Sequence, residues 1–211
     1  TFSPYYAGVL RNDVLNEALK EMNYIRSLVG VPSNVKLNSD YTNKAQHTAV
    51  LLDAIDTLTH TPGRPSDMGQ DFYALGYDGA QHGNLSFGWK SYNNGPRVGD
   101  MTLIKSLRRC MDDSDNSNIS RVGLRRWLMN PRMKQTGFGL STRRGFACTY
   151  VIEEGNSGKW PINDEFITWP TCKNLHPLEY FDENTAWSVT LNSDVFSSCN
   201  ENKIDRKSTR L

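Results

Sequence analysis

The 211-residue sequence lacks the features that mark several large classes of protein. Its apolar runs, such as 49–52, are far shorter than the roughly 18 residues that a membrane span needs. It also lacks an excess of either charge, because 24 Lys and Arg residues stand against 23 Asp and Glu residues and leave a net charge of +1. No strong field then attracts nucleic acid or an anionic membrane. We therefore expect no membrane span and no nucleic-acid partner.

Cysteine pairs and the short motifs of common enzyme classes are also missing. The four cysteines contain no Cys-x-x-Cys pair and are too widely spaced for a zinc ribbon: Cys110, Cys148, Cys172 and Cys199. The chain has no Gly-x-Ser-x-Gly elbow, no P-loop and no Gly-x-Gly-x-x-Gly turn. These absences weaken esterase, nucleotide-hydrolase and dinucleotide-binding hypotheses. We predict no cofactor.

The state of the cysteines has two interpretations. Four cysteines allow three pairings, and the sequence does not choose among them. We favour a disulfide between Cys172 and Cys199, since both lie in a loop-rich segment where a crosslink would most restrict the unfolded chain. The alternative is four buried thiols, because free cysteine is among the most buried residue types.

The periodicity of apolar residues predicts helices in the first part of the chain and strands in the last. Repeats of three to four residues predict helices in four segments: 13–30, 40–60, 101–111 and 120–128. Strands are predicted at 135–141, 146–152 and 185–191, the first two as a hairpin around the turn 142–145. This order indicates an α+β domain, with helices packed on a mainly antiparallel sheet of three to four strands.

The segment 61–99 is rich in Gly, Pro, Asp and Asn and has no sustained apolar period, so we expect a long surface loop. Loops of this length are often functional. The aromatic residues in it, among them Tyr77 and Trp89, either stack on sugar rings or cover the core. The chain length fits one domain, with its core at about 13–192 and a polar tail at 193–211.

Short motifs along the chain resemble those of the CAP superfamily, which comprises SCP-like, cysteine-rich secretory and pathogenesis-related domains, in its bacterial form. In chain order, the motifs are Asn23-Tyr24-Ile25-Arg26, the segment 45–60 ending in Thr59-His60, Asn84-Leu85-Ser86-Phe87-Gly88, the stretch 122–139 around Arg125-Arg126-Trp127, and Trp169-Pro170 through Trp187-Ser188. The resemblance implies an α/β/α sandwich. It also implies an extracellular or cell-surface domain, and we expect that any secretion signal ahead of Thr1 has been removed.

The chain departs from the family pattern at the cleft, where the family carries two histidines and two acidic residues. His60 matches the first histidine, but Gly83 stands in place of a glutamate and Leu124 in place of the second histidine. The remaining acid corresponds to Asp112 or Asp113. Because a transition metal needs about three protein ligands, we predict no metal at this position.

Several residues remain candidates for a ligand site. His82 could enter the cleft beside His60, with Asn84 as a hydrogen-bond donor; otherwise His82 is an exposed loop residue and His60 caps the end of a helix. Arg125 either binds a carboxylate or phosphate or packs its stem over the core. With Tyr77 and Trp89, these residues form the predicted ligand site.

We therefore predict a secreted or surface-exposed CAP-like domain that acts by binding. Its partner would be a small ligand, a cell-envelope glycan or peptide, a lipid or another protein. The alternative is a hydrolase with a rearranged site of His60, His82 and Asp112 or Asp113.

Overall fold

The computed structural model describes residues 3–93, 95–115, 118–153, 158–171, 174, 177–180 and 185–196. Its helices are α1 (Asn12–Leu28), α2 (Ser39–Ile55), α3 (Gln70–His82), α4 (Leu103–Asp112) and α5 (Gly123–Leu128), with a 3-10 turn at Leu178–Tyr180. Its strands are β1 (Lys36–Leu37), β2 (Gly83–Phe87), β3 (Trp89–Lys90), β4 (Val98–Gly99), β5 (Gln135–Ser141), β6 (Phe146–Tyr150), β7 (Phe166–Trp169) and β8 (Ser188–Leu191).

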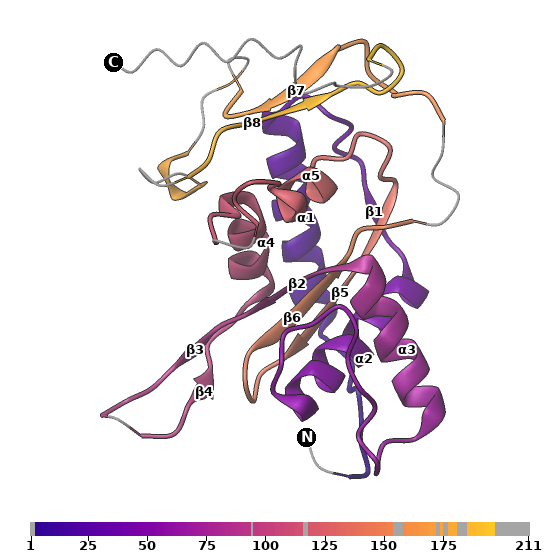
Figure 1. Cartoon of the computed structure of the whole chain (residues 1–211), viewed down its shortest axis with the longest axis vertical. Helices are drawn as coiled ribbons and strands as arrows, with labels where there is room; N and C mark the ends of the chain where they lie inside the picture. Colours follow the sequence, from indigo (N-terminus) through magenta and orange to yellow (C-terminus); the bar gives the residue numbers. More distant parts are fainter. Residues whose placement is uncertain are drawn as a thin grey trace.

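The central sheet has the strand order β1-β5-β6-β2. The β5–β6 and β6–β2 pairs are antiparallel, and only the short β1 runs parallel to its neighbour β5. Helices α2 and α3 lie on one side of this sheet, and α1 and α4 lie on the other (Figure 1). The predicted α+β fold, a three-layer sandwich around a mainly antiparallel sheet, is confirmed. No helix in the described part of the chain is long and apolar enough to cross a membrane.

The α1 side of the sheet holds the larger core. Phe138 of β5 and Val151 after β6 join side chains of α1 and α4, such as Met22 and Leu107, in one apolar cluster. Full burial of such a side chain stabilises the fold by about 1.5–3 kcal/mol. The alternation along β5 explains this arrangement, because every second residue of a strand points to the same face.

The other face of β5 carries glycine rather than bulky side chains. A Cβ atom on Gly137 would overlap the Tyr41 backbone, and one on Gly139 would overlap the Ala45 carbonyl group. Helix α2 therefore approaches the sheet closely because no side chain separates its backbone from β5. Leu52 of α2 completes this side by packing with residues of β2 and β6.

Helix α3 corrects the prediction of a long loop at 61–99. Its buried residues are Gly76, Gly79 and Ala80, and a Cβ on Gly79 would overlap Thr48 of α2. The two helices thus pack through small residues, so no apolar stripe marks α3 in the sequence. Strands β2, β3 and β4 also lie within this segment.

Helix α2 ends earlier than predicted. Its last residue is Ile55, and Asp56 follows in the left-handed conformation, with φ 53°. His60 therefore lies in the following loop rather than at the end of the helix. Thr57 to Thr59 separate it from the cap.

The predicted strands agree well with the structure. Strand β5 has the predicted bounds, and β6 and β8 lie within the predicted segments. The short strands β1 and β7 were not predicted. Strands β7 and β8 form a separate two-stranded sheet beyond α1, and β3 and β4 form a hairpin that projects from the body (Figure 1).

The cysteine prediction is tested only in part. Cys110 and Cys148 are free thiols in the core, and burial raises the pKa of both thiols above the ordinary value. Cys172 and Cys199 lie outside the described residues, as does most of the predicted polar tail. The favoured disulfide stays a prediction.

The close contact between the glycines of β5 and the backbone of α2 predicts that adding one methyl group destabilises the protein at Gly139 but not at Gly63. Gly139→Ala should lower the free energy of unfolding by about 2 kcal/mol or more, because overpacking against backbone cannot relax by a change of rotamer. Gly63→Ala is the control, since no atom lies within 4 Å of its added Cβ. Urea denaturation of both variants measures the difference. Equal stabilities would contradict the close approach of α2.

Candidate functional site

Two adjoining pockets lie along β2, the edge strand of the central sheet, and share Leu58 and Phe87 in their linings. Their volumes are about 400 and 530 Å³. We call the pair the groove. The first pocket, its aromatic end, is completed by Asp56, Trp89, Arg97, Arg144 and Phe146. The second, its acidic end, is completed by Leu85, Ser86, Arg109, Asp112, Asp113, Ser114, Asp115, Asn118 and Leu124.

The aromatic end is built from the β3–β4 hairpin and the β5–β6 turn. The Phe87 and Phe146 rings stack with their centroids 5.8 Å apart. The Arg97 guanidinium carbon lies 4.2 Å from the centroid of the Trp89 ring. Arg144 forms an ion pair with Asp56, with 2.6 Å between nitrogen and oxygen. This end therefore combines aromatic faces with cationic groups.

The acidic end is positioned by the junction of α4 and α5. Asp113 caps α4 in the left-handed conformation, with φ 45°, and its Oδ2 accepts a 3.2 Å hydrogen bond from the backbone nitrogen of Arg125. Its Oδ1 is buried without a hydrogen-bond partner in the structure. Burial raises the pKa of the Asp113 carboxyl, although the nearby Arg125 opposes the shift. Leu124 adds an aliphatic side chain to the lining.

Arg125 lies in the core behind the acidic end of the groove and does not line the groove. Its side chain is fully buried and donates to four acceptors at 2.6–3.1 Å: the carbonyl oxygens of Met111, Asp112 and Ala186 and the Ser188 hydroxyl. Burial lowers its pKa to about 10, an effect that Asp113 partly offsets. The structure thus assigns Arg125 the core-packing role rather than the predicted ligand contact.

A second buried arginine, Arg26 of α1, holds the segment that follows α5. Its Nη1 donates to the carbonyl oxygens of Leu128 and Asn130 at 2.7 and 3.0 Å, and its Nε donates to Pro32 at 2.8 Å. Burial lowers the pKa of this guanidinium to about 10, while Glu153 opposes the shift. Helix α5 is therefore anchored at both ends by buried cations.

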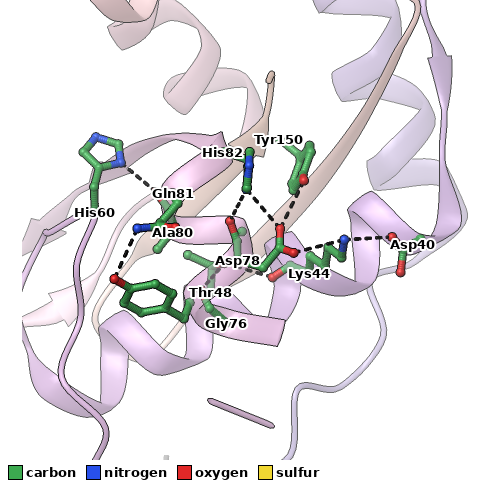
Figure 2. Close-up of polar contacts among 12 residues, drawn as sticks. Asp40, Lys44, Thr48, His60, Gly76, Asp78, Ala80, Gln81, His82 and Tyr150 are labelled. Carbon is green, nitrogen blue, oxygen red and sulfur yellow. Dashed lines mark hydrogen bonds and ion pairs between the residues drawn. The ribbon is translucent and has the colours of Figure 1, made fainter. Parts of the chain in front are cut away.

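The two candidate histidines lie near α3 and bind different groups. His60 Nδ1 lies 2.6 Å from the Ala80 carbonyl oxygen, and His82 Nδ1 lies 2.8 Å from that of Asp78 (Figure 2). Since a carbonyl only accepts, both rings carry their proton on Nδ1 in these contacts. Asp78 Oδ1 also lies 3.1 Å from His82 Nδ1.

Asp78 is the centre of a polar network around His82. Its Oδ1 accepts a 3.1 Å hydrogen bond from the Tyr150 hydroxyl, and its Oδ2 pairs with Lys44 at 3.2 Å. His82 stacks on Tyr150, with ring centroids 5.5 Å apart, and Lys44 also reaches Asp40 at 3.2 Å (Figure 2). His82 is therefore oriented by Asp78 rather than by Asp112 or Asp113.

The structure brings together only part of the predicted site. Trp89, Asp112 and Asp113 line the groove. His82 and Tyr77 instead line a separate pocket of about 370 Å³ on α3. Asn84 is buried and donates a 2.8 Å hydrogen bond to the Leu124 carbonyl oxygen, so it holds the groove wall in place.

Sequence reasoning did not identify Arg97, Arg144 and Leu58 as groove residues. Each comes from a loop or turn without a motif, and the contacts between them join segments far apart in the chain. The aromatic content of the segment 61–99 was the one signal that pointed to this region.

Within the described ranges, no three His, Cys, Asp or Glu side chains are grouped so that they could hold a metal ion. Comparisons of the chain with protein-family models, curated proteins and solved structures find no match. The resemblance to the CAP superfamily therefore rests on the sequence motifs alone.

The buried position of Arg125 predicts a large effect on stability. Arg125→Met should lower the free energy of unfolding by about 3 kcal/mol or more, because the buried carbonyl groups of Met111, Asp112 and Ala186 lose their donor. Arg126→Met is the matched control on the exposed side of the same helix, with an expected change within about 0.5 kcal/mol. Guanidinium denaturation compares the two variants. Similar losses would show that Arg125 does not anchor α5.

Proposed function

We propose that the protein is a CAP-like domain, secreted or exposed at the cell surface, that acts by binding a ligand in the groove. The order of the sequence motifs supports the family, and the three-layer arrangement agrees with what that family implies. The observation that carries the binding function is that two pockets adjoin and share Leu58 and Phe87 in their linings. Each pocket falls within the range of about 300–1,000 Å³ that is usual for ligand sites.

The lining of the groove favours an extended polar ligand. Leu58 and Phe87 remain 41% and 39% exposed where the pockets meet, and both provide apolar contact surface at the middle of the groove. Charged side chains lie at both ends, where an acyl chain would desolvate them at a cost. A glycan or peptide, whose polar groups can pair with these charges, therefore fits the groove better than a lipid tail.

The shared residue Leu58 provides a test of this site. Ligands are first sought by thermal shift with chito-oligosaccharides, acidic and neutral plant oligosaccharides, muropeptides and phosphatidylcholine vesicles, since binding to the native state raises Tm. Leu58→Asn should then weaken any hit about tenfold, because it places an amide at the apolar junction of the pockets. Val195→Asn is the control, being a similarly exposed aliphatic residue, 53% against 41%, outside the groove. Titration calorimetry measures both Kd values.

Two results would refute binding in the groove. One is a panel without any hit, and the other is a hit whose affinity changes equally in both variants. A hit lost in both variants together with a lower Tm would point to general destabilisation. Circular dichroism melts of each variant separate that case from loss of the site.

A hydrolase is the second candidate, favoured by the orientation of His82. Asp78 holds the His82 ring through Nδ1, and a general base needs such a partner to orient it. The predicted partners Asp112 and Asp113, however, line the groove, whereas His82 lines the separate pocket on α3. The structure thus offers a base and its orienting acid, without the rearranged site that was predicted.

The two candidates differ in their response to loss of the histidines. If binding is the function, 4-nitrophenyl acetate and casein should be cleaved at the same low rate by the wild type, His60→Ala and His82→Ala. Gln81→Ala, in the last turn of α3 next to His82, is the control. Hydrolysis that falls a hundredfold or more in His82→Ala alone, measured with initial rates, would favour the enzyme and exclude the purely binding role.

A further inference from the structure

Arg97 is an exposed arginine that is fixed in place without a counterion. Its guanidinium carbon lies 4.2 Å from the Trp89 ring centroid, well within the roughly 6 Å at which cations interact with aromatic faces. Among the residues that the structure describes, it has no ion pair and no hydrogen bond to its side chain. Its N–H groups are therefore available to a ligand.

Three cations near Arg97 contact carboxylates. Lys90 and Lys105 both contact Asp100, at 3.1 and 2.9 Å, and Arg144 contacts Asp56 at 2.6 Å. Of the two cations that line this end of the groove in the described part of the chain, Arg144 is paired with Asp56 and Arg97 has no ion pair. Water solvates both faces of an ordinary surface arginine. The Trp89 indole ring covers one face of the Arg97 guanidinium.

The surroundings of Arg97 are suited to a ring. Phe87 and Phe146 stack on one another in the same pocket, and Phe87 and Trp89 remain 39% and 43% exposed. Aromatic faces of this kind offer apolar contact to the C–H face of a sugar. The guanidinium fork binds a carboxylate or sulfate through two parallel hydrogen bonds. The aromatic end thus combines the two contacts that an acidic sugar needs.

We propose that the ligand of the groove contains an acidic sugar, whose carboxylate or sulfate is bound by Arg97 at the aromatic end. This inference rests on the proposed binding function. The opposite end carries Asp112, Asp113 and Asp115, which would repel a second anionic unit. The ligand is therefore an oligosaccharide with its negative charge at one end and neutral units along the rest of the groove.

Matched oligosaccharides test this charge pattern. The carboxylate probe is a tetrasaccharide of glucuronic acid on xylotriose, compared with neutral xylotetraose. The sulfate probe is neocarratetraose monosulfate, compared with the same tetrasaccharide after desulfation. The wild type should bind at least one acidic probe about tenfold or more tightly than its neutral partner, as expected for a charge-assisted hydrogen bond. The pair that shows the difference identifies the anionic group.

The contribution of Arg97 is separated from general electrostatics by a second arginine. Arg97→Gln should reduce the affinity for the acidic probe to that for its neutral partner, whereas Arg126→Gln should change it less than twofold. Both substitutions remove one exposed positive charge, but Arg126 lies on α5, outside the groove. Arg97→Lys should fall between the wild type and Arg97→Gln, because an ammonium group keeps the charge and loses the fork.

Three results would overturn the acidic-sugar inference: no binding of either acidic probe, equal affinity for acidic and neutral probes, or equal losses in Arg97→Gln and Arg126→Gln. These results are distinct from failure of the groove itself. If a neutral probe or a muropeptide binds and is lost in Leu58→Asn, the groove is a binding site and only the role of Arg97 is refuted. Melting curves of the Arg97 variants should match the wild type, since this side chain is exposed.

Discussion

The hydrogen bonds from two buried guanidinium groups to backbone carbonyl oxygens are the interaction on which the rest of this structure depends. Arg26 and Arg125 come from different helices, yet both bind mainly carbonyl oxygens, and both bind segments next to α5. Helix α5 has only six residues, too few to be stable through its own hydrogen bonds. The two cations donate hydrogen bonds to carbonyl groups in the last turn of α4, at the end of α5 and in the segment after α5. Their lowered pKa values, about 10 for each, express the cost of keeping them buried.

The hydrogen bonds of the two buried arginines also position the walls of the groove. Asp113 is held at the end of α4 by the backbone of Arg125, and Leu124 is held beside it by Asn84. The acidic end is thus a rigid wall set by internal contacts, whereas the aromatic end is formed by the projecting β3–β4 hairpin and the β5–β6 turn. The turn is itself anchored, because Arg143 pairs with the buried Asp53 of α2 at 2.7 Å. A ligand would therefore contact a wall held by internal hydrogen bonds at the acidic end and the projecting β3–β4 hairpin at the aromatic end.

The sequence predicted those parts of the fold in which side chains alternate or repeat. Strand β5 and helices α1, α2 and α4 have apolar residues at the expected spacing, and all four were predicted, with the end of α2 placed too late. Helix α3 was missed because Gly76 and Gly79 leave no apolar stripe. The candidate site was harder to predict. Asp112, Asp113 and Trp89 were identified, but Arg97 contacts a ring on β3 from the loop before β4, and Arg125 binds carbonyl groups that carry no sequence signature. Such contacts follow from tertiary structure rather than from local pattern.

The glycine contacts of α2 also affect how the sequence can diverge. On the α1 side of the sheet, one aliphatic side chain can replace another of similar volume at modest cost. On the α2 side, Gly79, Gly137 and Gly139 face backbone or short side chains directly, so even alanine would be too large. Sequence change is therefore tolerated unequally by the two layers. The spacing of these glycines should persist in distant relatives after the apolar pattern has changed, and it is the better marker of common ancestry.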